Sequence, residues 1–229
     1  MTSVNSWALY LHLIEQGEVP GVDFEAVAVN HHTDWPESYE YLEMMLAKGY
    51  PVTVIEPDVG GFSDLYKYCL RYAILPSRFK RWCTSGFKVQ PLLDYFERPC
   101  VDLIGFDALE IRRARGMREK EGVVQEYPLI EAGIDRKGCM ELIARHGLPL
   151  PTKSGCFICP FQSKHVWIEM RRTHPDLFCK ARTLEELFND RRTSKSKSKH
   201  YFRDKPLDLI VQETQVRMWD DRPPCRCGL

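Results

Sequence analysis

The chain has 229 residues, of which 44% are hydrophobic and 28% are charged, and its 32 basic residues balance 32 acidic ones. A chain of this size and composition folds around a sizeable core, which excludes the disordered and disulfide-scaffold classes, and its zero net charge provides no global field for polyanions. No apolar run approaches the roughly 18 residues of a membrane span, so no membrane partner is expected.

Helical and strand patterns alternate along the chain. The predicted elements, in chain order, are a helix over 5–16, a strand over 25–30, a helix over 36–48, a strand over 51–55, helices over 63–74 and 88–96, a strand over 101–105, and helices over 136–146, 164–172 and 183–190. This order predicts an α/β fold with an open, mostly parallel sheet flanked by helices and a small helical C-terminal part. Ligands bind such sheets at the carboxyl ends of the strands.

The composition changes near residue 190, which predicts an α/β domain over 1–190 and a basic, flexible tail over 191–229. Seven basic residues lie between 191 and 205 against one acid, Asp204. They are Arg191, Arg192, Lys195, Lys197, Lys199, Arg203 and Lys205. The tail is interpreted either as a solvated linker or as an arm that neutralises nucleic-acid phosphates and delivers Cys225 and Cys227 to the active site.

Nine cysteines are many for such a chain, and an odd number cannot pair completely. The first six residues lack the basic segment of an export signal, so we expect a reducing, cytoplasmic compartment in which cysteines are metal ligands, redox groups or core residues. The closest pairs are the CxxC of Cys156 and Cys159 and the CxC of Cys225 and Cys227. A CxxC places two sulfurs on one metal, although core packing and a catalytic dithiol remain alternatives.

Two predicted loops carry polar groups suited to a ligand. Ser3-Val4-Asn5-Ser6 opens a helix, where hydroxyls and backbone N–H groups bind anions; the alternative is a simple N-cap by Asn5 or Ser6. His31-His32-Thr33-Asp34-Trp35-Pro36 follows a strand, where it would meet a ribose or a metal; the alternative is a solvated turn in which Asp34 caps the next helix.

Charged residues mark two further segments. Cys83 is flanked by Arg81 and Lys88, whose charges favour a thiolate; a half-buried cysteine beside a basic surface patch is the alternative. Glu110 and Arg113 share one helix face, as an ordinary surface ion pair also would.

Taken together, these segments resemble the phosphoadenosine phosphosulfate (PAPS) reductase-like branch of the PP-loop, or adenine nucleotide alpha-hydrolase, superfamily over roughly residues 1–190. The matching segments are Asn5-Ser6, His32-Thr33-Asp34, Arg81-Trp82-Cys83 with Lys88 and Pro91-Leu92, Gly105 with Glu110 and Arg113, Tyr127-Pro128-Leu129, Gly155-Cys156-Phe157-Ile158-Cys159-Pro160, and Cys227-Gly228-Leu229. The chain departs from the family pattern in lacking both glycines of the SGGxDS loop, in carrying Trp82 for a cysteine, and in carrying Arg226 for a glutamate.

The resemblance implies an iron–sulfur enzyme, with a 4Fe–4S cluster, that does sulfur chemistry on an adenine-nucleotide-activated substrate. In this interpretation Cys83, Cys156 and Cys159 are the cluster ligands, with Cys139 as a fourth or with one iron left open to hold a sulfide. Soft thiolates without paired histidines favour such a cluster over zinc.

The resemblance also implies roles for the remaining residues. Asn5, Ser6, Asp34, Glu110 and Arg113 border ATP or another adenine nucleotide. Arg81 and Lys88 meet its anionic groups, and Cys227 is the nucleophile of a reductase. A reductase takes electrons from a thiol donor, whereas a sulfurtransferase acts on tRNA or another nucleic acid acceptor. The alternative is a non-catalytic nucleotide- or nucleic-acid-binding module with a structural cluster.

Overall fold

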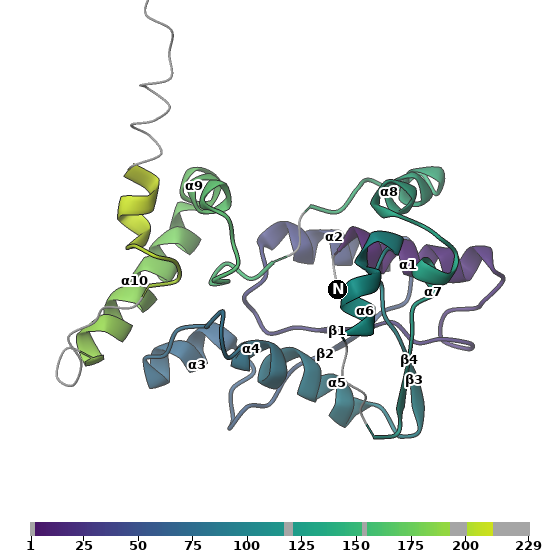
Figure 1. Cartoon of the computed structure of the whole chain (residues 1–229), viewed down its shortest axis with the longest axis horizontal. Coiled ribbons are helices and arrows are strands. Elements are labelled where there is room, and N and C mark those ends of the chain that lie inside the picture. Colours follow the sequence, from purple (N-terminus) through teal and green to yellow (C-terminus); the bar gives the residue numbers. More distant parts are fainter. Residues whose placement is uncertain (1–2, 117–120, 153–154, 193–200, 213–229) are drawn as a thin grey trace, which may run out of the picture. The chain divides into compact units, whose positions relative to one another are not determined.

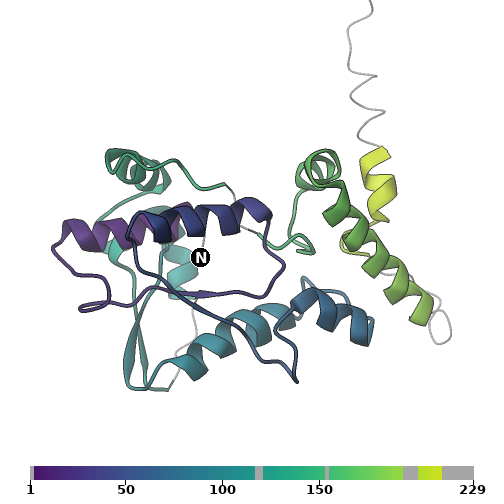
Figure 2. The same ribbon diagram turned by 180° about the vertical axis from the view of Figure 1, so that it is seen from behind.

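The computed structural model describes residues 3–116, 121–152, 155–192 and 201–212, and it divides the chain into two compact units (Figures 1 and 2). The first unit comprises residues 1–63 and 84–156, and the second comprises residues 64–83 and 157–229. The division therefore differs from the predicted boundary at residue 190, because residues 64–83 belong with the C-terminal part of the chain.

Four predicted helices are observed with shifts of at most one residue. They are α1 (Val4–Glu15), α2 (Pro36–Ala47), α8 (Arg136–Arg145) and α9 (Lys164–Thr173). Three of them begin at a side chain that accepts a hydrogen bond from a first-turn N–H, namely Ser3 for α1, Asp135 for α8 and Ser163 for α9. Capping of this kind fixes a helix start locally, which is why the sequence places these helices well.

Other elements differ from the prediction in length or were not predicted. The segment over 183–190 is part of α10 (Pro175–Arg192), and the helix over 63–74 is shortened to α3 (Leu65–Tyr72). The remaining elements are α4 (Trp82–Thr84), the π-helical η1 (Ser85–Val89), α5 (Gln90–Tyr95), the 3₁₀-helical η2 (Ala108–Glu110), α6 (Ile111–Arg115), β4 (Val123–Glu126) and α7 (Pro128–Glu131). Of these, only α5 lies within a predicted helix, over 88–96.

The strands of the first unit form two parallel pairs flanked by helices. β1 (Val27–Val29) pairs with β2 (Thr53–Ile55), and β3 (Cys100–Leu103) pairs with β4. The α/β class and the parallel pairing are therefore confirmed, but within the described residues no ladder joins the pairs into one open sheet. Both pairs line one cavity of about 830 Å³, with Val27 on β1 and Val101 on β3.

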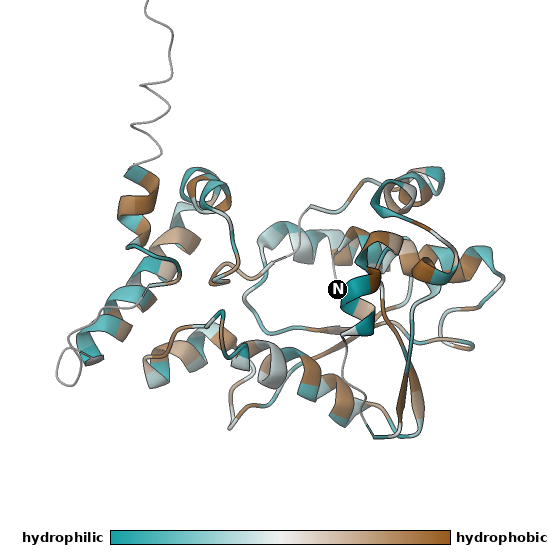
Figure 3. Cartoon of the chain, viewed as in Figure 1, coloured by the Kyte–Doolittle hydropathy of each residue, from teal (hydrophilic) through white to brown (hydrophobic). Residues whose placement is uncertain are grey.

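The core of the first unit lies between α1, α2, α7 and α8. Its members are apolar and buried, and Figure 3 shows the hydrophobic colour of much of α1. They are Val4, Trp7, Ala8, Leu9, Tyr10, Leu11, Tyr41, Met45, Leu129, Cys139, Leu142, Ile143 and Leu148. This packing holds the N-terminus of α1 in a fixed place, which matters for the site described below.

The second unit is built from α3, α9, α10 and residues 201–212, the last of which the sequence analysis assigns to a flexible tail. The Trp167 ring lies 5.5 Å from that of Phe202, and both side chains are buried. The Glu185 carboxylate on α10 accepts hydrogen bonds from the backbone N–H groups of Phe202 and Leu207, each at 3.0 Å. In the described part of the chain, no helix is long and apolar enough to cross a membrane.

Candidate functional site

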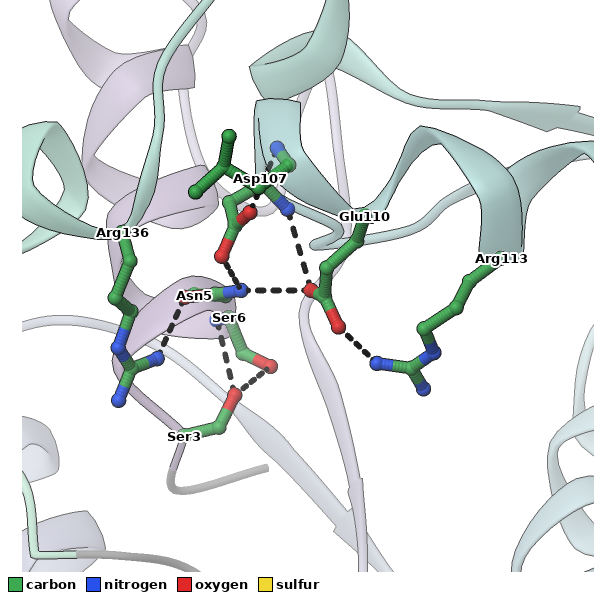
Figure 4. A network of polar contacts seen from close by, with 8 residues as sticks. Ser3, Asn5, Ser6, Asp107, Glu110, Arg113 and Arg136 are labelled. Carbon is green, nitrogen blue, oxygen red and sulfur yellow. Dashed lines mark hydrogen bonds and ion pairs between the residues drawn. The ribbon is translucent and has the colours of Figure 1, made fainter.

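The side chain of Asn5, in the first turn of α1, is the centre of a polar network in the first unit (Figure 4). Its amide nitrogen donates to Asp107 and to Glu110, both at 3.0 Å, and its amide oxygen accepts from Arg136 at 2.6 Å. Asn5 and Asp107 are buried, with 7% and 5% of their surfaces exposed. Buried polar groups of this kind are stable because each has a partner.

The loop that carries Asp107 and Glu110 is shaped by a capping box. Asp107 accepts from the backbone N–H of Leu109, and Glu110 accepts from the backbone N–H of Asp107. Glu110 also pairs with Arg113 on α6. Both carboxylates are therefore held by the protein itself, and their role in the network is to fix Asn5 and Arg113.

Arg113 lies at the exposed edge of this network. Its guanidinium carbon lies 4.3 Å from the ring centroid of Phe106, whose ring stacks on that of Tyr127 at 5.9 Å and 11°. The head group remains largely exposed. Figure 3 shows α6 in hydrophilic colours, and the helix carries Arg112 and Arg115 as well.

Gly105 allows this loop to approach α1 closely. A Cβ atom at this position would lie 3.1 Å from the backbone oxygen of Asn5 and 3.3 Å from the Cα of Ser6. Contacts this short are tighter than a side-chain carbon normally makes, so only glycine fits without displacement. Gly105 therefore has a packing role, because it lets the loop lie against the start of α1 at the candidate nucleotide site.

The N-cap of α1 is neither of the two residues, Asn5 and Ser6, that the sequence analysis considers for that position. Ser3 takes that place. The Ser3 hydroxyl oxygen accepts from the Ser6 backbone N–H at 3.2 Å and lies 2.9 Å from the Ser6 hydroxyl oxygen. Asn5 is thus free to make the long-range network, and Ser6 presents its hydroxyl beside it.

Asp34 lies in a second cluster of the first unit, with His31, Thr33 and Cys156. The Cys156 thiol donates to the Thr33 hydroxyl at 3.0 Å, and that oxygen lies 2.7 Å from Nδ1 of His31. Asp34 pairs with Cys156 in an isolated antiparallel bridge. It does not cap the following helix, because Trp35 occupies that position without a side-chain bond.

The imidazole of His31 is neutral at neutral pH. Burial, and to a smaller extent the charge of Lys88, lowers the pKa of His31 to about 4, while Asp34 opposes the shift. The 3.5 Å separation between Nε2 of His31 and the Asp34 carboxylate is therefore not an ion pair at pH 7. This histidine packs and orders the loop.

The four predicted metal ligands have different environments. None of the four is in a disulfide; Cys83 and Cys159, in the second unit, are partly exposed, and Cys156, in the first, is buried. Cys139 is fully buried in the core on α8, and burial raises its pKa to about 11. Cys139 packs among the apolar side chains of this core, as in the core-residue alternative raised for the cysteines.

The predicted catalytic residues are not brought together within one unit. Arg81 belongs to the second unit and Lys88 to the first. Cys227 lies outside the described residues, as do Cys225, Lys195, Lys197 and Lys199. No group of three metal-ligating side chains is found in the described residues.

Sequence reasoning missed Asp107 and Arg136. Asp107 carried a signal, since an aspartate three residues before Glu110 is the pattern of a capping box. Arg136 carried none, because its contact with Asn5 spans 131 residues. Comparisons of the chain with protein-family models, with curated proteins and with solved structures find no match.

Proposed function

We propose that the chain is an iron–sulfur enzyme of the PP-loop type that does sulfur chemistry, by sulfur transfer or by reduction of an activated sulfate, on an adenine-nucleotide-activated substrate. The observation that carries the proposal is the network around Asn5. Four of the five residues that the family resemblance assigns to the nucleotide, Asn5, Ser6, Glu110 and Arg113, lie together there although they come from distant parts of the chain.

The network suits an anionic ligand. Asp107 and Glu110 accept from Asn5 and from backbone N–H groups, and Glu110 also pairs with one nitrogen of the Arg113 guanidinium. That guanidinium is largely exposed, and its further N–H groups can pair with phosphate oxygens. Guanidinium–phosphate bonds are charge-assisted and often bidentate. The Ser6 hydroxyl and the N-terminal end of α1 add dipoles of the same sense.

The proposed cluster takes Cys83, Cys156 and Cys159 as ligands. None of the three is in a disulfide, and Cys83 and Cys159 are partly exposed. When bound, such a cluster supplies sulfur or electron chemistry. Cys139 is fully buried among the apolar side chains of the first unit's core, so the proposal has three cysteine ligands.

The cluster is tested by purifying the full chain without oxygen. We expect a brown protein with iron and acid-labile sulfide in comparable amounts. Cys156→Ser and Cys159→Ser should each bleach it, because a serine oxygen is a poorer ligand for iron.

Cys139→Ser is the matched control, and it should keep the iron and sulfide content of the wild type. Stoichiometric zinc without sulfide would refute the cluster, and bleaching by Cys139→Ser would restore the four-cysteine site.

The nucleotide is tested by equilibrium binding of ATP and of adenylyl sulfate. Arg113→Ala should lower the affinity for the nucleotide roughly 10- to 150-fold, because it removes a charge-assisted contact of about 1.5–3 kcal/mol. Arg112→Ala, on the same helix, should bind as the wild type does. Equal affinities for the two variants, or no binding of either nucleotide, would contradict the nucleotide role.

A further inference from the structure

A short loop of the second unit, residues 77–81, combines exposed cations with an exposed aromatic ring. Its sequence is Ser77-Arg78-Phe79-Lys80-Arg81, with no acidic residue. The Phe79 side chain is 97% exposed, the highest value among the large exposed hydrophobic residues of the described chain. A phenylalanine this exposed is unusual for a residue type that is normally buried.

The loop has a defined conformation. The Phe79 backbone N–H donates to the Ser77 hydroxyl at 3.2 Å, and the Arg81 N–H donates to the Ser77 carbonyl at 3.2 Å. Arg81 adopts a positive φ of 41°, which a non-glycine residue rarely does. These contacts hold Phe79 at the tip of the turn, away from any core.

A second exposed aromatic ring adjoins the loop. Phe161 is 51% exposed, and the guanidinium carbons of Arg78 and Arg81 lie 5.6 Å and 5.5 Å from its ring centroid. Within the described residues, no carboxylate forms an ion pair with Arg78, Lys80 or Arg81. The surface therefore offers two exposed rings and three cations over a few residues.

We infer that the loop 77–81 together with Phe161, here called the Phe79 surface, binds single-stranded nucleic acid. Bases stack on exposed aromatic rings and on guanidinium planes, while phosphates pair with neighbouring cations. Phe79 lies between Arg78 and Lys80 in the sequence, so one loop carries a ring for a base and cations for the neighbouring phosphates. The binding needs neither the Asn5 network nor a cluster.

Fluorescence anisotropy with the full chain and a labelled single strand of about 12 thymidines tests the inference, since site sizes are ~4–16 nucleotides. Phe79→Ala should weaken binding about 5- to 150-fold through the loss of stacking. It should leave the slope of log affinity against log salt unchanged, because no charge is removed.

The double variant Arg78→Ala, Lys80→Ala should instead reduce the slope of log affinity against log salt. Three phosphate contacts on a single strand give a slope of about −2, and removing two cations should reduce its magnitude by about 1.4. Both variants alter exposed side chains, so folding should be unaffected, which circular dichroism checks.

The controls separate this surface from other sources of binding. Phe79→Trp should bind at least as tightly as the wild type, and Phe79→Leu should bind as weakly as Phe79→Ala. Val22→Ala, which removes an exposed apolar side chain of the first unit, should have no effect.

Three outcomes would overturn the inference. The first is equal binding by Phe79→Ala and the wild type, as would occur if Lys195, Lys197 and Lys199 of the tail carried the affinity. The second is retention of affinity by Phe79→Leu together with binding to vesicles of phosphatidylserine and phosphatidylcholine in equal parts, which would indicate a membrane surface. The third is the absence of any binding at low salt.

Discussion

Asn5→Asp should lower the free energy of unfolding by about 3 kcal/mol at pH 7, a large part of the roughly 5–15 kcal/mol of a typical domain. The amide nitrogen of Asn5 donates to two carboxylates, each 3.0 Å away. The substitution places a third negative charge against them, and the single pairing with Arg136 does not compensate it. Urea unfolding, followed by fluorescence and circular dichroism, measures the loss.

An asparagine-to-aspartate substitution should be harmless where the side-chain oxygen accepts the hydrogen bond. Asn30→Asp is the matched control, because the Asn30 side-chain oxygen accepts from the His32 N–H, a bond that a carboxylate keeps. The deficit of Asn5→Asp should shrink as the pH is lowered towards about 4, where carboxyl groups take up protons. Equal stability of Asn5→Asp and Asn30→Asp at pH 7 would show that the network does not hold α1 in place.

The helices could be predicted because their signals are local. Ser3, Asp135 and Ser163 cap the helices that follow them, and each is recognisable from a few neighbouring residues. The strands of only three or four residues carry weaker patterns. The strand over 123–126 has two valines followed by Gln125 and Glu126, too short an apolar run for a prediction.

The division into units and the membership of the site could not be predicted, because both depend on contacts distant in sequence. The Tyr66 hydroxyl donates to the Lys180 carbonyl, which ties α3 to a helix 114 residues further on. Asn5 meets Asp107 across 102 residues. Composition marked the change near residue 190, but it carries no information on which segments pack together, and it did not place Phe202 in a core.

The stability of the second unit should fall as the pH rises from about 4.5 to above 7, because of Glu185. This carboxyl is only 3% exposed, and burial raises its pKa to about 7, although the N–H groups of Leu207 and Phe202 oppose the shift. A carboxyl with a raised pKa in the folded state contributes its full stability below the unfolded value of about 4.3. That contribution is lost as the pH passes through the folded value. At about 1.4 kcal/mol per pKa unit, the expected loss is roughly 3 kcal/mol.

Glu185→Gln isolates this effect. The glutamine stays neutral, so it should flatten the dependence between pH 5 and pH 8, and the variant should gain stability relative to the wild type as the pH rises. Glu169→Gln, an exposed position on α9 that is not among the groups shifting the pKa of Glu185, should keep the wild-type profile. Hydrogen exchange of the Phe202 and Leu207 amides, corrected for intrinsic rates, reports the opening of residues 201–212 directly. The prediction is wrong if the unfolding free energy of the wild type does not change between pH 5 and pH 8, or if it rises equally in the wild type and in Glu185→Gln. Either result would mean that the Glu185 carboxylate is ionised in the folded protein at little cost, and that its two N–H contacts hold the segment at every pH.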